Sequence, residues 1–565
     1  MVRGNVPFPL THVDPTPARD RIPAHQRNLT VREVEYGDTG SGETDGRGRP
    51  DAGCDMNRPR LIGSLAYDVG RMLGLVSLAM ATLLAIGTLF GEFDALVGVA
   101  GALALTGGAS GLLLAVGKPN PRPSRAYGML VAALGWLTVA LVGALPFLGV
   151  AWAYQLAPPA GVPLAATAPF GDPMNAFFES MSGFTGTGLS VAPAPAQLPH
   201  VLQWWRSLTE WVGGIGVIVL TTAILSRPGS GSLTLYESDA RAERLHFEVL
   251  PRLRSIVGIV VLFTAGSVVL LLSVGLPPWA ALNDAMTGLT TGGFSVTNAS
   301  IGAYHDPLVS LAFVPIMATG SIAFPVLYLV LRGEVGALRR DVQARWFAGI
   351  CLVGTAVLVG TFSAARSGIA GHHVVIAALF QFVSALSCTG FSTVPIGSLP
   401  TNAKLLLVLA MVVGGSAGST VGGIKLIRLL TLSYGTVHRI RGTFYPPHVV
   451  RPLRVGERLL TEAQAALEIE EAAIISFLWV VFLLGGVAVL QAAFAADGTP
   501  HTLWNVVFEV ASAQGNVGLS TGITTAGLPA AVKLSLAGNM WIGRLEIIPV
   551  AVALEGLLTG LNASR

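Results

Sequence analysis

Four short turns, rich in glycine or hydroxyl side chains, carry the residues of this chain that could do chemistry. Each turn has a glycine at its fourth position, where the backbone can adopt dihedral angles that a Cβ atom would oppose. Main-chain carbonyls pointing inward from such turns can replace the hydration shell of a bare monovalent cation. The turns therefore predict a four-part ion-selectivity filter. They are Thr185, Gly186, Thr187 and Gly188; Thr290, Thr291, Gly292 and Gly293; Ser387, Cys388, Thr389 and Gly390; and Gly515, Asn516, Val517 and Gly518.

The spacing of the turns indicates a fourfold repeat. Their last glycines, Gly188, Gly293, Gly390 and Gly518, lie 105, 97 and 128 residues apart, which is a domain-sized interval. Four units in one orientation can close around a single axis, each forming one wall of a pore. Close helix packing is the alternative, because small residues also let membrane helices approach one another. One isolated turn would fit either explanation, whereas four equivalent turns favour the filter.

The composition is typical of an integral membrane protein, with 52% hydrophobic and 12% charged residues among 565. A helix needs roughly 20 apolar residues to cross the hydrocarbon core. Ten segments meet this length: about 69–90, 95–116, 126–153, 202–226, 255–276, 308–331, 344–365, 402–433, 469–496 and 533–560. Four shorter apolar runs suit re-entrant helices better: 173–183, 278–288, 374–386 and 501–513. The sequence predicts an all-α integral membrane protein with ten transmembrane helices and four re-entrant pore helices around one pseudo-fourfold pore.

Basic residues predict the orientation of these spans. They gather in every second connection, as at Arg339, Arg340 and Lys425, whereas the connections that hold the short runs have almost none. The positive-inside rule then places both termini in the cytoplasm and all four turns in the outer half of the membrane. The predicted divisions are a polar cytoplasmic extension, 1–60; an extra N-terminal helix pair, 61–117; and four pore repeats, 118–230, 231–335, 336–458 and 459–565.

The N-terminal extension holds as many acidic as basic residues. Such a segment cannot bury enough apolar surface to offset its ordering entropy, so we expect 28–60 to be largely disordered. The three cysteines, Cys54, Cys351 and Cys388, show no paired spacing, and neither a disulfide framework nor a zinc site is predicted.

Beyond the turns, several longer motifs make the chain resemble the Trk/Ktr/HKT superfamily of potassium transporters, and its TrkH-like branch most closely. Segment 177–183 (FFESMSG) is similar to the first pore helix of that family, and 205–216 (WRSLTEWVGGIG) to its first inner helix. Segment 414–425 (GGSAGSTVGGIK) resembles the intramembrane gate loop, and 542–546 (IGRLE) the last inner helix. The spans at 69–116 look like the additional helix pair of the TrkH branch, although the fourth turn is more similar to the KtrB branch.

This resemblance implies a function, an ion and partners. Glycine at all four filter positions accompanies potassium selectivity in the family, so the chain is expected to hold K⁺ through backbone carbonyls and to carry it across the cytoplasmic (inner) membrane. No cofactor is expected on the chain itself. The implied partners are a second copy in a homodimer, a separate cytosolic nucleotide-binding regulatory subunit (TrkA- or KtrA-like) and membrane lipid, but no nucleic acid.

The third inner span is interrupted by a glycine-rich stretch. Each glycine destabilises a helix interior by about 1 kcal/mol relative to alanine, so this stretch should unwind into a flexible plug below the filter. A phosphate-binding loop is a poor alternative, because Lys425 does not directly follow the last glycine and no Ser or Thr follows it. The predicted gate residues are Gly414, Gly415, Ser416, Ala417, Gly418, Ser419, Thr420, Gly422, Gly423 and Lys425, together with Arg544.

Arg544 is an ionisable residue in the middle of a predicted span, where such residues are costly and functional by default. The resemblance implies that it faces the pore beneath the filter, contacts the gate loop and helps to hold the gate closed. The alternatives are a local pair with Glu546 or a side chain that extends to the interface.

Other polar residues lie beside the short runs. Glu179, Asp284 and Glu509 could draw cations to the outer mouth or hydrogen-bond the re-entrant backbone, and a structural role is favoured for Glu179. His372 and His373 are expected at the interface rather than on a metal.

The competing functions are a symporter that couples K⁺ to Na⁺ or H⁺ and a less selective K⁺/Na⁺ pathway. Symporter folds favour inverted repeats with midplane sites, unlike four parallel repeats with turns in the outer half. An enzyme is not expected, because the spans show no HExxH motif, no carboxylate pair and no serine with a placed base.

Overall fold

The computed structural model describes residues 58–120, 124–159, 163–224, 249–364, 373–446, 452–456 and 458–562, all within one compact unit, Asn57–Arg565. The predicted extension 1–60 lies outside the described residues except for its last three, which begin the first helix. His372 also lies outside them.

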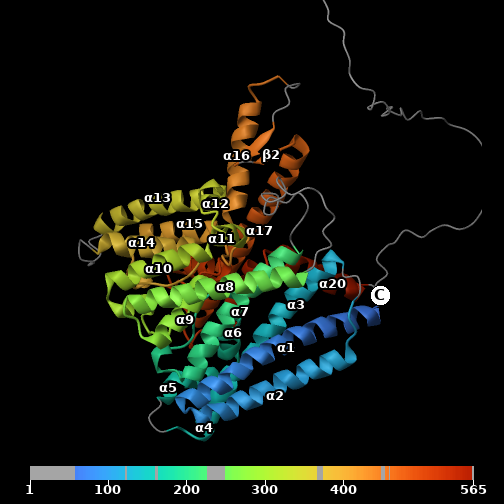
Figure 1. Cartoon of the computed structure of the whole chain (residues 1–565), viewed down its shortest axis with the longest axis vertical. Helices are drawn as coiled ribbons and strands as arrows, with labels where there is room; N and C mark the ends of the chain where they lie inside the picture. Colours follow the sequence, from blue (N-terminus) through green and yellow to red (C-terminus); the bar gives the residue numbers. More distant parts are fainter. Residues whose placement is uncertain are drawn as a thin grey trace, which may run out of the picture. The chain divides into compact units, whose positions relative to one another are not determined.

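The described chain is helical apart from one small hairpin (Figure 1). An N-terminal pair, α1 (Arg58–Phe90) and α2 (Phe93–Val116), precedes four similar groups of helices. The first group is α3 (Arg125–Gly143), α4 (Leu145–Leu156), α5 (Leu164–Thr167), α6 (Pro173–Thr185) and α7 (His200–Ile224). The second is α8 (Val249–Ser273), α9 (Pro278–Leu289), α10 (Pro307–Gly320), α11 (Phe324–Leu331) and α12 (Gly336–Arg340). The third is α13 (Val342–Ala364), α14 (Val374–Leu386), α15 (Thr401–Val413) and α16 (Leu426–Gly442). A hairpin of strands β1 (Leu453–Val455) and β2 (Arg458–Leu460) follows. The fourth group is α17 (Glu462–Asp497), α18 (Leu503–Gln514), α19 (Ala530–Arg544) and α20 (Ile548–Asn562).

Each group contains a short helix that ends at one of the predicted turns and cannot cross a membrane. Helices α6, α9, α14 and α18 have 13, 12, 13 and 12 residues, and at about 1.5 Å per residue they reach little more than half of a 30 Å hydrocarbon core. Their starts follow from local sequence. The Asp172 side chain accepts from the N–H of Met174 at 2.9 Å, and Thr502 caps α18 in the same way.

Two predicted spans are bent where the sequence analysis expected continuous helices. The segment 308–331 is divided into α10 and α11, inclined by 108°, and 533–560 into α19 and α20, inclined by 111°. Glu546 and Ile547 lie between α19 and α20 with φ of +61° and +69°, which a right-handed helix cannot accommodate. Within the described residues, six helices are long and apolar enough to span a membrane, or up to eight if each bent pair is one span. The count of ten spans stays a prediction.

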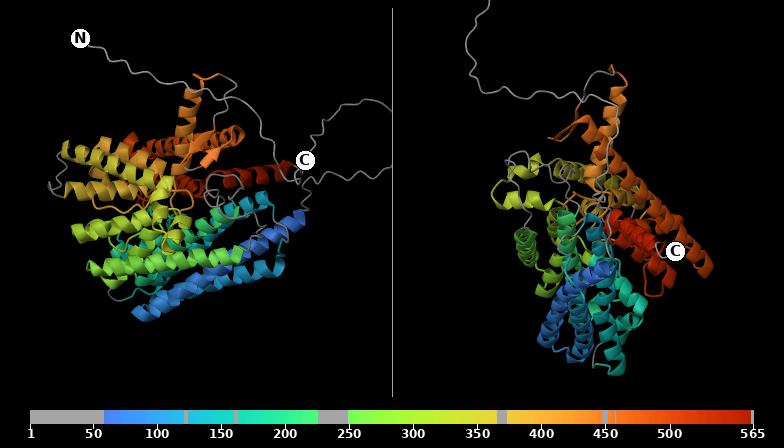
Figure 2. Two further views of the ribbon diagram at one scale, coloured as in Figure 1. Left: turned by 45° about the horizontal axis from the view of Figure 1, so that its top comes forward. Right: turned by 90° about the vertical axis from the view of Figure 1, so that its right-hand side faces the viewer.

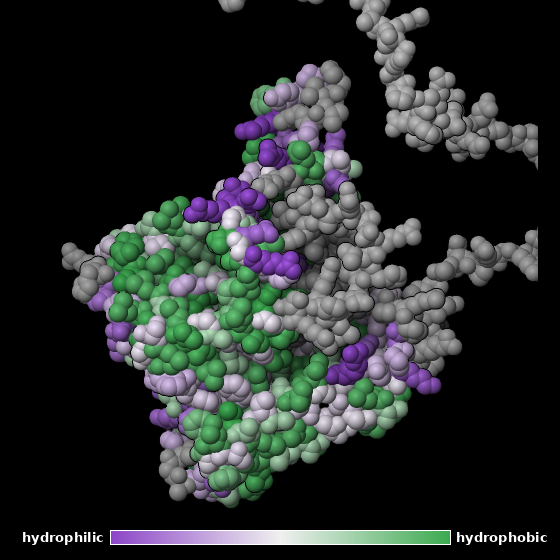
Figure 3. Space-filling model, in the orientation of Figure 1, coloured by the Kyte–Doolittle hydropathy of each residue, from purple (hydrophilic) through white to green (hydrophobic). Residues whose placement is uncertain are grey.

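Helix α16, the hairpin and the start of α17 project from the remaining helices (Figure 2). The hairpin packs Leu453, Val455 and Leu460 against Tyr434 and Ile469 of those two helices. Hydrophobic side chains cover much of the face over α8, α10 and α13, whereas hydrophilic residues gather near α12 and α16 (Figure 3). This distribution suits an apolar body within a membrane and a polar projection outside it.

Candidate functional site

The four predicted turns are built as helix C-caps of one type. The second residue of each turn is left-handed, with φ of +60° at Gly186, +55° at Thr291, +51° at Cys388 and +51° at Asn516. The third residue donates its N–H to a carbonyl five residues earlier, as in Thr187 to Ser182 at 2.8 Å. This is the Schellman pattern, which satisfies the last carbonyls of a helix. Each short helix therefore brings the negative end of its dipole to the turn.

The fourth glycines form a closed ring. Gly188, Gly293, Gly390 and Gly518 have φ of +82°, +90°, +83° and +96°. A methyl group on Gly188 would lie 2.1 Å from the carbonyl oxygen of Gly292 in the second turn, and one on Gly293 would lie 2.1 Å from that of Thr389 in the third. A methyl group on Gly390 would lie 1.8 Å from the carbonyl oxygen of Val517 in the fourth turn, and one on Gly518 would lie 2.3 Å from that of Thr187 in the first. The order first, second, third, fourth and back to first shows that the structure brings the third- and fourth-position residues of the four predicted turns together in one ring.

A hydroxyl residue stands six residues before each glycine, and in three of the four repeats its side chain hydrogen-bonds the turn; the sequence analysis missed it. Thr287 and Ser384 donate to the carbonyl oxygens of Phe294 and Phe391 at 2.8 and 2.6 Å. Ser512 accepts from the N–H of Gly518 at 3.0 Å, whereas the Ser182 hydroxyl has no partner among the described residues. The constant spacing from the glycine was the signal that could have identified these residues.

The three carboxylates of the short helices hold the segments that follow the first, second and fourth turns. Glu179 accepts from the N–H of Val191 at 2.9 Å, Glu509 from that of Thr521 at 3.0 Å, and Asp284 from the Tyr304 hydroxyl at 3.1 Å. All three acids are fully buried. Of the two roles considered from the sequence, the geometry supports hydrogen bonding rather than an exposed cation-attracting mouth.

Glu179 also neutralises a buried arginine that joins the first two turns. Arg206 Nε donates to the Glu179 carboxylate at 2.8 Å, and its Nη1 donates to the carbonyl oxygen of Ser295 at 2.9 Å. Its guanidinium lies over the Phe294 ring at 4.1 Å. One buried ion pair therefore fixes the loops after two adjacent turns.

We expect Glu179→Gln to destabilise the protein by about 3–5 kcal/mol, because it leaves the Arg206 charge buried without its counter-charge. Unfolding of the detergent-solubilised protein by denaturant measures this. Glu334→Gln is the control, since Glu334 is exposed. Equal stability of the two variants would contradict the assigned role of the pair.

A further buried acid, Glu210, lies behind the second turn and was not identified from the sequence. Its carboxylate accepts from the N–H of Phe294 at 3.1 Å, and it is fully buried. It is the eleventh residue of α7, and the eleventh residues of α10, α15 and α19 are Met317, Met411 and Met540. The supporting shell is thus not fourfold symmetric although the glycine ring is.

The predicted gate residues form an irregular loop between α15 and α16. Gly414, Gly418 and Gly423 have φ of +68°, +80° and +73°, so the span is interrupted where the glycines predicted. A methyl group on Gly422 would lie 2.1 Å from the carbonyl oxygen of Gly515 in the fourth turn. Thr420 Oγ1 lies 2.9 Å from Thr291 Oγ1 of the second turn. The loop therefore lies directly against the ring.

The loop is also anchored to the bend between α10 and α11. Ser416 donates its N–H to the carbonyl of Ser321 at 3.1 Å, and the Gly418 carbonyl accepts from Phe324 at 3.0 Å. The N–H of Ala417 donates to the Gln343 side chain at 2.8 Å.

Arg544 joins this loop to the first inner helix. It is the last residue of α19 and is 4% exposed. Its Nη1 donates to the carbonyl of Thr420 at 2.7 Å and its Nη2 to that of Gly213 at 3.2 Å. A methyl group on Gly186 would lie 3.3 Å from Nη2, so the guanidinium is next to the first turn.

Glu546 pairs with Lys425 and Arg428 rather than serving as the local partner of Arg544. Lys425 Nζ and Arg428 Nη2 each donate to one oxygen of its carboxylate. This cluster connects the loop end and α16 to the bend between α19 and α20. Arg428 was not among the predicted gate residues.

We expect Glu546→Gln to speed amide exchange in 414–425 at least tenfold, because two charge-assisted hydrogen bonds are each worth about 1.5–3 kcal/mol. Hydrogen–deuterium exchange with mass spectrometry measures this, with Glu470→Gln on the exposed face of α17 as the control. Unchanged protection in the loop would show that the cluster does not restrain it.

Among the described residues, no group of three His, Cys, Asp or Glu side chains could hold a metal ion. The expectation that the chain binds no cofactor stays a prediction.

The sequence and the fold of this chain are similar to those of known cation transport proteins. Residues 162–558 match the model of the TrkH family, described as cation transport protein. An uncharacterized cation transporter of Methanocaldococcus jannaschii is 32% identical over 75% of this chain and 81% of its own length. The Trk system potassium uptake protein TrkH of Salmonella typhimurium is 28% identical over 75% of this chain and 84% of its own. The crystal structure of the potassium transporter TrkH from Vibrio parahaemolyticus matches with a TM-score of 0.74 at 23% identity, covering 88% of this chain and 99% of that one.

Proposed function

Since this chain belongs to the TrkH family of cation transport proteins, we propose that it takes up potassium ions through a gated, channel-like pore. The observation that carries the proposal is the closed ring of glycines, in which each turn presents a main-chain oxygen beside the filter glycine of the preceding turn. The family is one of transporters rather than enzymes, and the fold is that of a multi-pass membrane protein.

The filter is assigned to the sixteen turn residues. Carbonyl oxygens of the third positions, Thr187, Gly292, Thr389 and Val517, replace water around the ion, and the helix dipoles add negative potential. Potassium is proposed over sodium because relatives in Salmonella typhimurium and Escherichia coli are named potassium uptake proteins and all four filter glycines are present here.

The gate is assigned to the loop 414–425 and Arg544. A guanidinium beside the first turn opposes the passage of a second positive charge, and the loop lies against the second and fourth turns. Conduction needs the loop and Arg544 to move together, because the carbonyl of Thr420 accepts from the guanidinium.

The driving force is the membrane potential, worth about 2.3 kcal/mol per charge for each 100 mV. With the four turns in the outer half and both termini in the cytoplasm, an inside-negative potential draws K⁺ inward. The proposed assembly is a homodimer in the inner membrane. A separate nucleotide-binding subunit, TrkA- or KtrA-like, docks on the projecting α16, whose last turn holds Arg439 and Arg441.

Purified protein in liposomes tests the proposal. We expect a potassium current that needs no sodium or proton gradient, with a reversal potential that follows the K⁺ gradient. A requirement for a Na⁺ or H⁺ gradient would favour the coupled symporter. Equal permeability to K⁺ and Na⁺ would favour the less selective pathway. Either result would overturn the proposal.

A further inference from the structure

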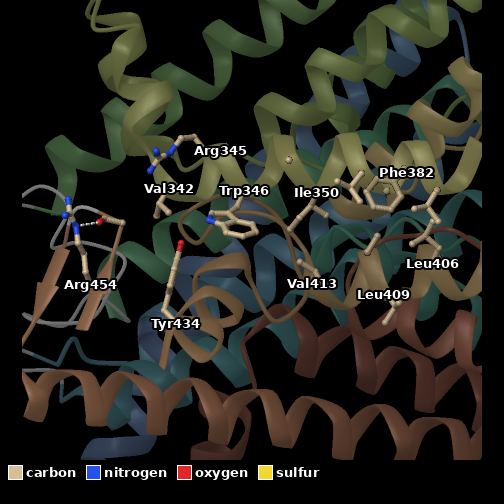
Figure 4. Close-up of a pocket in the computed structure, with 16 residues that line it drawn as sticks. Val342, Arg345, Trp346, Ile350, Phe382, Leu406, Leu409, Val413, Tyr434 and Arg454 are labelled. Atoms are coloured by element: carbon tan, nitrogen blue, oxygen red, sulfur yellow. Dashed lines mark hydrogen bonds between the residues drawn. The ribbon is translucent and has the colours of Figure 1, made fainter. Parts of the chain in front are cut away.

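A groove of about 1050 Å³ lies beside the gate, between α13, α15, α16 and the hairpin (Figure 4). Phe382, Leu406 and Leu409 lie at one end, and Arg345 and Arg454 at the other. Trp346 and Tyr434 lie between them. The groove thus has one apolar end and one cationic end.

Several hydrogen-bond donors at the cationic end make no bond to the described residues. Among the described residues, the Arg345 guanidinium and the Tyr434 hydroxyl make no hydrogen bond. Within the same part of the chain, Arg454 makes one hydrogen bond, from Nε to the carbonyl of Gly456 at 3.0 Å. Asp341, which precedes α13, interacts electrostatically with Arg345, but its carboxylate already accepts from the N–H of Ala344 at 2.7 Å. Two guanidinium groups can therefore bind an anion.

The position of the groove fits the edge of a bilayer. Helix α13 is one of the candidate membrane spans, and Arg345 lies at its N-terminal end, just after Arg339 and Arg340 of α12, whereas Arg454 belongs to β1. Trp346 is 45% exposed there, and tryptophan is enriched at the membrane–water interface. Basic pockets between membrane helices on the cytoplasmic side bind anionic lipid head groups.

We propose that this groove binds an anionic phospholipid, with its phosphate on Arg345 and Arg454 and an acyl chain against Leu406, Leu409 and Phe382. The lipid contacts Val413, the last residue of α15 before the glycine-rich loop, and Tyr434 of α16. It therefore touches both helices that flank this loop.

A second copy of the chain fits the groove less well than a lipid. None of the described residues that line it is acidic. A twofold contact presents the same patch from both copies, so it would bring the arginines of the two copies toward one another.

One glycine allows the groove to be filled without disturbing the fold. A Cβ atom on Gly349, which lines the groove from α13, meets nothing within 4 Å. The same is true of Gly360, which lies on α13 but does not line the groove. Gly349→Phe and Gly360→Phe are thus a matched pair.

Native mass spectrometry of the full chain in detergent, with phosphatidylglycerol or phosphatidylcholine of identical acyl chains added, tests the proposal. We expect phosphatidylglycerol to bind at least about tenfold more tightly. The double variant Arg345→Gln, Arg454→Gln should lose that preference. Gly349→Phe should lose the bound lipid, and Gly360→Phe should retain it.

Three results would overturn the proposal. Equal binding of both lipids, or binding that Gly349→Phe leaves unchanged, would mean nonspecific annular lipid. Displacement of the lipid by an equal concentration of soluble glycerol phosphate would mean a site for a small anion. A Gly349→Phe variant that changes only the oligomeric state, measured by light scattering, would mean an interface between two copies.

Discussion

Gly390→Ala is expected to reduce the potassium current in liposomes by about a hundredfold or more. The added methyl group would lie 1.8 Å from the carbonyl oxygen of Val517, against an ordinary contact of at least 3.4 Å. One of the two turns must therefore move by more than about 1 Å, and a displacement of that size at a functional centre costs on the order of a hundredfold. The backbone at +83° is a second obstacle to alanine.

The control for this variant is Gly522→Ala. Gly522 has φ of +92°, but a Cβ atom there meets nothing within 4 Å. The Gly522→Ala variant has comparable backbone strain without the collision, so its potassium current should equal that of the unchanged protein. If both variants lost the current equally, strain in the segment after the turns, rather than displacement of ring oxygens, would be the cause. Normal conduction by Gly390→Ala would refute the carbonyl ring as the filter.

Arg544→Ala is expected to raise the potassium current of the protein without any partner at least tenfold. Removing the guanidinium deletes a positive charge beside the first turn, a repulsion on the order of a few kcal/mol for a passing cation. It also releases the carbonyls of Thr420 and Gly213, which that side chain holds. Single-channel or flux recordings in liposomes measure the change.

Arg544→Lys separates the two contributions of this side chain. Lysine keeps the charge but cannot reproduce the two-branched geometry of a guanidinium. A current near that of the unchanged protein would assign the barrier to charge, and a current near that of Arg544→Ala would assign it to the hydrogen bonds. If Arg544→Ala left the current and its regulation unaltered, Arg544 would have no part in the gate.

The supporting shell shows why the four repeats are not interchangeable. The position nine residues before the filter glycine is acidic in three repeats, whereas the third has Gln381, whose side-chain amide has no partner among the described residues. The eleventh residue of the inner helix is a buried acid, Glu210, only in the first repeat, where it contacts the second turn; the other three inner helices have methionine there. The third repeat supplies the loop that lies against the ring, and the fourth supplies Arg544.

The amino-acid sequence by itself determined the features that depend on neighbouring residues. The lengths of the apolar runs predicted the four short helices that end at the turns, and the glycines located the turns and the interruption of the third inner span. These properties arise from local backbone freedom and from the fixed thickness of a bilayer, so periodicity and residue type are enough to predict them.

Only the tertiary structure decided which distant groups meet. Gly518 lies beside the carbonyl of Thr187, more than three hundred residues away in the chain, and Glu546 binds Lys425 and Arg428 rather than its neighbour Arg544. Hydrogen bonds and ion pairs of this kind act over a few ångströms, and no local pattern states which charged residue of one repeat will face which carbonyl of another.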